Sequence, residues 1–197
     1  ERRGWVRGEV GRGTFVCPPA FTPAAPAVSD SVDFATNALL PHQHARELID
    51  KLTALVARST PEDLFNYQPH GGRADHREIA ARWLQRAQVP ADPATTVLTS
   101  GAQHAMTVAL STLTTPGDVV LREAVTYTGM RSLANHLHVQ LHPVAMDHEG
   151  LLPDALEDAA YESGGRVVYC VPSGQNPTAR VLSRKRRQDI ARVAPRV

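Results

Sequence analysis

Residues 99–106, TSGAQHAM, join two segments of different hydrophobic periodicity, and this junction decides the fold. The run TTVL before them is short and apolar, as in a buried strand, whereas MTVALSTL suits a helix. A strand that breaks at Ser100-Gly101-Ala102 and opens into a helix presents free backbone N–H groups and the positive end of the helix dipole. The turn therefore predicts an anion site of the kind that phosphate groups occupy.

Strands and helices alternate on the C-terminal side of this turn. Apolar runs at TTVLT, DVVLRE, VQLHPVAM and RVVYCVP are separated by the helical segments AQHAMTVALSTL, YTGMRSLANHL and PDALEDAAYES. This order predicts a parallel α/β sheet, whose strands are short and buried. Further helices are expected before the turn, in HARELIDKLTALVAR, from Pro61, and in DHREIAARWLQRA with Ile79, Trp83 and Leu84. In the first of these helices we expect Leu48, Leu52 and Leu55 to face inward.

Composition describes a globular chain of 197 residues, 42% apolar and 21% charged. The formal charge of +1 gives no whole-chain reason for binding nucleic acid or a membrane. Cys17 and Cys170 fit no metal or redox spacing, so both are expected to be free thiols. The chain has no signal-peptide core and no run near the roughly 18 apolar residues of a membrane span, so we expect a cytoplasmic protein.

Histidines occur in two groups that superficially suggest a metal centre. No carboxylate or cysteine pattern completes either group, so no metal is expected. The groups are His42/His44 and His136/His138/His142.

Three turns follow strands, where open α/β sheets bind ligands: SGAQ, EAVTYTG and PSGQNPT. A phosphate at Gly101, Ala102 and Gln103 could be joined to a flat ring under Tyr127, with the Asn176 amide at the ring's polar edge. The implied ligand is a phosphorylated aromatic compound. Each residue also has a structural reading, with Tyr127 as an ordinary half-buried side chain and Asn176 as a turn starter.

The segments YQPHGG, TSGAQHAM, PGDVVLREAVTYTG and QNPT, in this order, resemble fold-type I aminotransferases that use pyridoxal 5'-phosphate (PLP). The resemblance covers residues 37–197 and implies a three-layer α/β domain with a largely parallel sheet. It implies that Ser100, Ala102 and Gln103 hold the phosphate, that Tyr127 stacks on the pyridine ring, and that Asn176 contacts its phenolic oxygen. Tyr67 would reach the phosphate of the neighbouring subunit in a homodimer. The family usually has glycine where this chain has Ala179.

Catalysis with PLP needs a lysine that holds the aldehyde as a Schiff base. In the family that lysine, and the aspartate at the pyridine nitrogen, lie beyond the Asn-Pro-Thr motif. This chain has two lysines, Lys51 and Lys185, and neither matches the position of the Schiff-base lysine. The aspartate is not identifiable either. The catalytic residues are therefore unknown, and we expect the chain to be a fragment.

The first 16 residues contain WVRGEVGRGTFV, which predicts a two-stranded ribbon around a Gly-Arg-Gly turn. This ribbon resembles the wing that closes a GntR-type winged-helix domain, without the DNA-reading helices. A Pro/Ala-rich linker is predicted over residues 17–36. Winged helix, linker and aminotransferase-like domain in one chain resemble MocR transcription regulators.

Three functions are compatible with these resemblances. The first is a DNA-binding regulator that senses PLP, or an amino compound through aldimine chemistry. The second is a metabolic aminotransferase that moves an amino group between an amino acid and a 2-oxo acid. The third is a PLP-binding scaffold without turnover.

Overall fold

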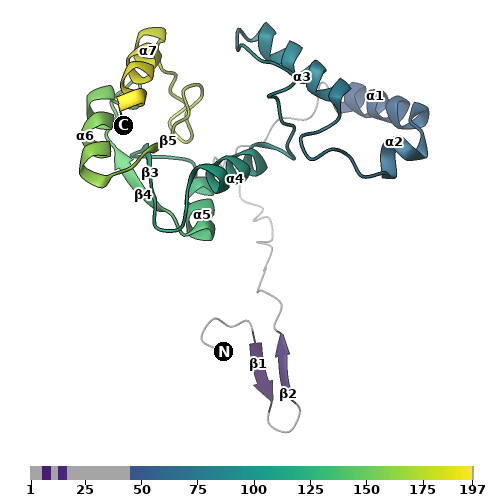
Figure 1. Cartoon of the computed structure of the whole chain (residues 1–197), viewed down its shortest axis with the longest axis horizontal. Helices are drawn as coiled ribbons and strands as arrows, with labels where there is room; N and C mark the ends of the chain where they lie inside the picture. Colours follow the sequence, from purple (N-terminus) through teal and green to yellow (C-terminus); the bar gives the residue numbers. More distant parts are fainter. Residues whose placement is uncertain (1–5, 10–12, 17–44, 197) are drawn as a thin grey trace, which may run out of the picture. The chain divides into compact units, whose positions relative to one another are not determined.

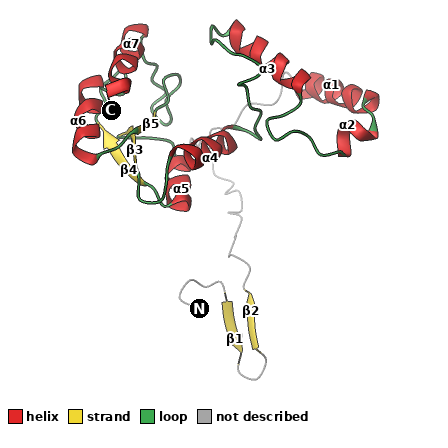
Figure 2. Cartoon of the chain, viewed as in Figure 1, coloured by secondary structure: helices red, strands yellow, loops and turns green. Residues whose placement is uncertain are grey.

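The computed structural model describes residues 6–9, 13–16 and 45–196 (Figures 1 and 2). They belong to two compact units, one ending at Asn66 and one beginning at Tyr67. The linker predicted over residues 17–36 lies outside the described residues, as do residues 37–44.

The first unit contains a two-stranded ribbon and two helices. Strands β1 (Val6–Glu9) and β2 (Gly13–Val16) pair antiparallel, which confirms the predicted ribbon. Helix α1 spans Ala45–Arg58 and helix α2 spans Pro61–Phe65. Thr60 caps α2, because its side chain accepts from the Asp63 N–H while the Asp63 carboxylate accepts from the Thr60 N–H.

Helix α1 forms as predicted, but its apolar face is not inward. Leu48, Leu52 and Leu55 are each at least half exposed, and α1 has no buried residue. The expectation that they face inward is therefore wrong for the described residues. An amphipathic helix buries its apolar stripe only where another element covers it, and α2 does not provide that cover.

The second unit alternates helices and strands from α3 onward. Its strands form one sheet of order β4-β3-β5, in which both pairings are parallel. The parallel sheet with intervening helices confirms the predicted α/β class. The elements are α3 (Ala74–Arg86), α4 (Ala102–Leu113), β3 (Val119–Glu123), α5 (Thr128–Leu137), β4 (Gln140–Val144), α6 (Pro153–Ser163), β5 (Val167–Tyr169), α7 (Arg184–Val193) and a short 3-10 helix (Ala194–Arg196).

The sheet is the middle of three layers, because successive residues of β3 face opposite sides. Val120 packs with Met130 and Leu133 of α5 and Leu110 of α4. Leu121 packs on the other side, against α6 and α7 in a cluster that includes Leu156 and Val193. Figure 1 shows α4 and α5 on one side of the sheet and α6 and α7 on the other.

The segment TTVLT does not form the strand that its apolar pattern predicts. Residues 96–99 have no regular secondary structure, and the Leu98 N–H donates to the Gly71 carbonyl at 3.0 Å. A strand exists only where a neighbouring strand takes up its N–H and C=O groups, and none of the described strands pairs with residues 96–99.

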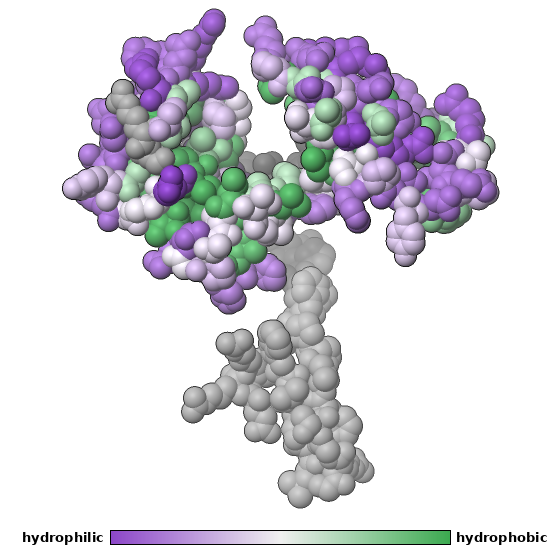
Figure 3. Space-filling model, viewed as in Figure 1, coloured by the Kyte–Doolittle hydropathy of each residue, from purple (hydrophilic) through white to green (hydrophobic). Residues whose placement is uncertain are grey.

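Several apolar side chains of the second unit lie on its surface. Leu113 of α4 and Ile79 and Trp83 of α3 are more than half exposed, and Val108 of α4 is slightly less exposed. Figure 3 shows apolar residues gathered around α4 and β4 on the viewed face. None of the described helices is long and apolar enough to cross a lipid bilayer.

An ion-paired cluster ties the loop after β4 to α7. Two Arg186 nitrogens bind the two Asp147 carboxylate oxygens at 2.7 and 3.2 Å, and one of them also donates to the Leu151 carbonyl at 2.9 Å. Glu149 lies 3.3 Å from the same guanidinium. The Arg186 guanidinium holds the pKa of the Asp147 carboxyl well below its ordinary value.

We expect this lowered pKa to make stability depend on pH in acid. The contribution of Asp147 is complete above the ordinary aspartate pKa of about 4 and is lost as pH falls through the lower folded-state pKa, because the unfolded chain binds the proton first. The variant Asp147→Asn should be less stable at neutral pH and should lose less stability on acidification. Urea unfolding midpoints at several pH values between 7 and 3 measure this difference. An equal fall of the urea unfolding midpoint between pH 7 and 3 in the two proteins would contradict this prediction.

Candidate functional site

The N-terminus of α4 is an open backbone cradle. Gly101 precedes the helix with φ of 89°, and no side chain caps the first turn. Nothing lies within 4 Å of the position that a Cβ on Gly101 would occupy. The N–H groups of Ala102 and Gln103 have no carbonyl one turn earlier to bond, so they are available to an anion.

Hydrogen bonds within the turn hold this cradle in shape. The Ser100 N–H donates to His104 Nδ1 at 3.0 Å, and the Ala105 N–H donates to the Gly101 carbonyl at 3.1 Å. The Thr99 hydroxyl also donates to the Gly101 carbonyl. Residues Ser100 to Gln103 are exposed. The turn therefore presents its backbone to solvent with its conformation already fixed.

Tyr127 follows β3 and precedes the first turn of α5, where it is half-buried. Its ring covers Gly129, because a Cβ on Gly129 would lie 2.2 Å from Tyr127 Cε1. The Gln103 side chain donates to the Gly129 carbonyl at 3.3 Å. This bond brings the α4 cradle next to the segment that carries Tyr127.

Asn176 lies in the turn that follows β5 and is half-buried. A backbone bridge between Ser173 and Val181 closes the turn, and the Asn176-Pro177 peptide bond is cis. Ala179 has φ of 56°, in the left-handed region. That conformation costs an alanine roughly 1–2 kcal/mol, which is a physical reason for glycine at this position in other chains.

Glu123 and Gln175 are two buried polar residues beside the candidate site that were not predicted from the sequence. Both are buried, and Gln175 Nε2 donates to Glu123 Oε2 at 3.1 Å and to the Val125 carbonyl at 2.7 Å. These bonds join the Tyr127 segment to the Asn176 turn. The available signal was an acidic residue at the end of the apolar strand Val119–Glu123, a position where a buried carboxyl requires partners.

The structure thus brings the α4 cradle, Tyr127 and Asn176 to the edge of the sheet where β3 and β5 end. It does not bring Tyr67 to them, because the Tyr67 side chain is fully exposed at the start of the second unit. An exposed side chain suits the predicted contact with a neighbouring subunit, and that contact stays a prediction.

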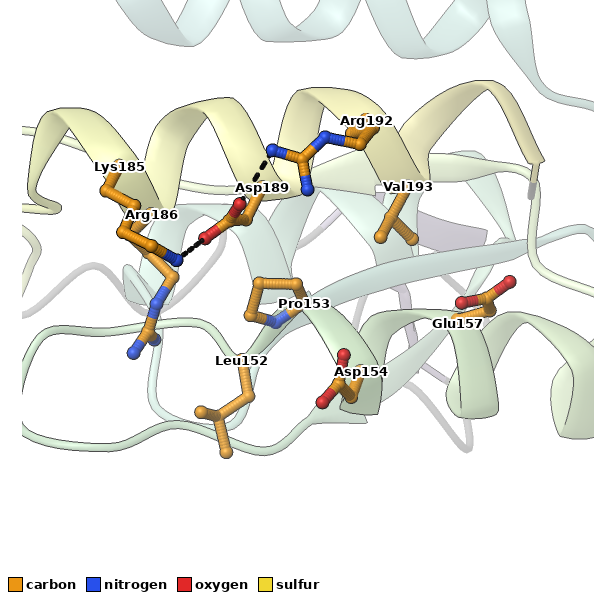
Figure 4. Close-up of a pocket in the computed structure, with 9 residues that line it drawn as sticks. All are labelled: Leu152, Pro153, Asp154, Glu157, Lys185, Arg186, Asp189, Arg192 and Val193. Atoms are coloured by element: carbon orange, nitrogen blue, oxygen red, sulfur yellow. Dashed lines mark hydrogen bonds and ion pairs between the residues drawn. The ribbon is translucent and has the colours of Figure 1, made fainter.

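One cavity lies near the end of β3, and another lies beside α7. One of about 280 Å³ is lined by Tyr127, Thr128 and Pro177 among others, but not by residues 100–103. The other, of about 500 Å³, lies between α6 and α7 and contains Asp189 bonded to Lys185 and Arg192 (Figure 4). Among the described residues, no group of three or more His, Cys, Asp or Glu could hold a metal ion.

The residues at the sheet edge carry the kinds of groups that a phosphorylated ring would need, and the cavity of about 280 Å³ beside them is lined by Tyr127 but not by residues 100–103 or Asn176. The uncapped first turn of α4 supplies N–H donors for a phosphate, and the open space at Gly101 lets the anion approach the backbone. Tyr127 supplies an aromatic face, and Asn176 supplies an amide from the adjoining turn.

Residues 29–197 match the family model for aminotransferases of class I and II. Over 195 residues the chain is 27% identical to the uncharacterized HTH-type transcriptional regulator YdeF of Bacillus subtilis, covering 97% of this chain and 42% of that protein. It is 26% identical over 172 residues to aromatic-amino-acid aminotransferase 1 of Thermococcus litoralis, covering 84% of this chain and 41% of the enzyme.

Among solved structures, kynurenine aminotransferase of Pyrococcus horikoshii, determined with PMP, is similar with a TM-score of 0.75 and 27% identity. That likeness covers 86% of this chain and 43% of the enzyme. The chain therefore spans about two-fifths of the length of these relatives. Relatives of this kind include both HTH-type regulators and aminotransferases, and class I and II aminotransferases use PLP. The family model, the parallel three-layer fold and these relatives together show that the chain belongs to the aminotransferase class I and II family.

Proposed function

We propose that the chain is the PLP-binding part of a MocR-type transcription regulator. The observation that carries this proposal is the extent of the likeness to YdeF, which covers 97% of this chain and so extends before residue 29 into the segment that contains the ribbon. In this proposal the antiparallel ribbon formed by β1 and β2 would be the wing of a winged-helix domain, which such a domain places against DNA. In this proposal PLP, or an amino compound that reacts with it, changes how the protein binds DNA.

The cofactor would be held by residues at the sheet edge. The backbone of Gly101, Ala102 and Gln103, with Ser100, would bind the phosphate, Tyr127 would stack on the ring, and Asn176 would contact its phenolic oxygen. Bound PLP supplies an aldehyde that captures amines and a ring that withdraws electrons. Tyr67 would contribute from one subunit of a homodimer to the phosphate of the other.

A metabolic aminotransferase is the second candidate, favoured by the likeness to the Thermococcus litoralis and Pyrococcus horikoshii enzymes. In that case the same residues would hold the cofactor. The two candidates differ in DNA binding, which only the regulator requires.

DNA binding by the full-length protein tests the regulator directly. We expect it to bind duplex DNA with an affinity that falls steeply as salt rises, because phosphate contacts release counterions. The present chain should bind DNA weakly, because the ribbon alone offers few phosphate contacts. Fluorescence anisotropy of labelled duplexes across a salt series measures both affinities. If full-length protein transfers the amino group between an amino acid and a 2-oxo acid but does not bind DNA, that result would favour the metabolic aminotransferase.

The variant Gly129→Ala should weaken PLP binding by displacing the Tyr127 ring. The added Cβ would lie 2.2 Å from Tyr127 Cε1, so the ring must move. Loss of ring stacking is worth roughly 0.5–1.5 kcal/mol, and Tyr127→Ala should cost a similar amount. PLP dissociation constants of full-length protein, from quenching of intrinsic fluorescence, provide the measurement.

The double variant distinguishes ring displacement from a general loss of structure. If Gly129→Ala acts through Tyr127, adding it to Tyr127→Ala should weaken PLP binding no further. Additive losses in the two variants would show that Gly129 acts by another route.

A further inference from the structure

Glu123 and Gln175 stand out as buried polar side chains in a layer of otherwise apolar packing. The exposed fraction is 0% for Glu123 and 2% for Gln175. Glu123 Oε1 accepts from the Val171 N–H at 3.3 Å, and Oε2 accepts from Gln175 Nε2 at 3.1 Å. One carboxyl at the end of β3 is thereby bonded to two positions in the chain that leaves β5.

The same Gln175 side chain also shapes the turn that carries Asn176. Its carbonyl oxygen accepts from the Thr178 N–H at 3.0 Å and from the Thr178 hydroxyl at 2.6 Å. Its amide nitrogen donates to Glu123 and to the Val125 carbonyl. Both ends of the amide are therefore in use, one toward the Tyr127 segment and one within the Asn176 turn.

Burying this polar pair costs more folding free energy than burying apolar side chains, so stability alone does not explain it. Burial raises the pKa of Glu123, and only hydrogen bonds from Gln175 and Val171 oppose that effect. No cationic side chain is among the groups that shift this pKa. Apolar side chains could fill such a space at lower cost, whereas a fully bonded polar group admits one arrangement of its neighbours.

The two segments that this pair joins carry the two residues proposed to contact one ring. Tyr127 lies four residues after Glu123, and Asn176 is the residue after Gln175. A pyridine ring has a fixed size, so a stacking side chain and an edge-binding amide can serve it together only at a fixed separation.

We propose that the Glu123–Gln175 pair is a positioning element that sets the separation of Tyr127 and Asn176 for one PLP ring. This inference rests on the proposed cofactor site. The pair does not touch the cofactor itself. It acts through the two residues that do.

The variant Glu123→Gln tests the pair with almost no change in volume. It replaces one acceptor oxygen by a donor, so either Val171 or Gln175 is left with an N–H facing another N–H. In the free variant we expect the Asn176 turn to shift until this donor finds a partner, and PLP binding must then restore the original separation at the cost of one buried unsatisfied donor. That cost is worth about a tenfold change in an equilibrium, so we expect PLP to bind full-length Glu123→Gln about tenfold more weakly. The circular dichroism of bound PLP in its own absorption band should also change, because it reports the orientation of the ring.

The double variant Glu123→Gln with Gln175→Glu should restore the wild-type signal. The new amide at position 123 can accept from Val171 and donate to the new carboxyl at position 175, which still accepts from Thr178. The carboxyl oxygen that replaces Gln175 Nε2 faces the Val125 carbonyl, so the new carboxyl must keep its proton there, as burial favours, and donate it to that carbonyl. Recovery of most of the PLP affinity and of the dichroism band is the expected result.

Asp118→Asn is the matched control. It makes the same change of carboxyl to amide just before the amino end of the same strand, where Asp118 accepts from the Thr115 N–H at 2.7 Å and the Thr115 hydroxyl at 3.0 Å. We expect it to change the unfolding midpoint without changing PLP affinity or the dichroism band. This separates positioning from general stability.

The possible outcomes distinguish failure of the positioning role from failure of the proposed cofactor site. Wild-type protein that binds no PLP overturns the proposed function, and the inference that rests on it falls as well. Wild-type protein that binds PLP, with Glu123→Gln folded and equal to it in affinity and dichroism, overturns the positioning role alone. If Glu123→Gln does not fold, the double variant decides, because a folded double variant with an altered dichroism band also overturns the role.

Discussion

Replacing Gly101 by valine should weaken PLP binding by the full-length protein about tenfold to a hundredfold. A β-branched residue held at φ of 89° carries roughly 1–3 kcal/mol of backbone strain, so the turn will relax and carry its N–H groups away from the anion. The valine side chain would also occupy the space through which a phosphate approaches the backbone. Titration with PLP, followed by its absorption, measures the loss.

Gly117→Val is the control for backbone strain alone. Gly117 has a similar φ of 97°, and nothing lies within 4 Å of its Cβ position either. It precedes the amino end of β3, at the edge of the sheet away from the proposed site. Both variants should lose comparable stability in urea, but only Gly101→Val should lose PLP. Unchanged PLP binding in Gly101→Val would remove the phosphate cradle from the proposed site.

Treatment of the present chain with PLP and borohydride should label neither lysine stoichiometrically. A lysine that forms a Schiff base efficiently at neutral pH is desolvated, which lowers its pKa and frees the amine. Lys51 donates to Glu47 and its side chain is 72% exposed. Lys185 donates to Asp189 at 2.8 Å and is 85% exposed (Figure 4). Both amines therefore lie in solvent and in ion pairs, not in a desolvated pocket.

Peptide mass mapping after reduction identifies any labelled lysine. Under the proposed function, the same treatment of full-length protein should give a stoichiometric adduct on a lysine other than these two, because a PLP site holds the aldehyde on one desolvated lysine. Arginine variants of Lys51 and Lys185 should leave that adduct in place. Stoichiometric labelling of Lys51 or Lys185 in the present chain would contradict the assignment of both as surface residues.

The local sequence pattern was sufficient to predict most helices and strands of the second unit. The periodicity of residues 102–113 and 153–163 predicted α4 and α6, and the apolar runs predicted β3, β4 and β5. These segments carry their own signal, because a helix satisfies its backbone internally and a buried strand is recognisable by its apolar residues. The run TTVLT carries the same signal and forms no strand, because strand formation depends on a partner that the run itself does not encode.

The sequence by itself determined the α/β class and the turn at Ser100-Gly101-Ala102, because both follow from periodicity and from the backbone freedom of glycine. Only the tertiary structure decided that Gln103 bonds to Gly129, that the Tyr127 ring covers Gly129, and that Glu123 meets Gln175. Glu123 and Gln175 are 52 positions apart, and no local pattern relates them. Their meeting follows from the parallel pairing of β3 with β5, which brings the carboxyl ends of two distant strands to the same edge of the sheet.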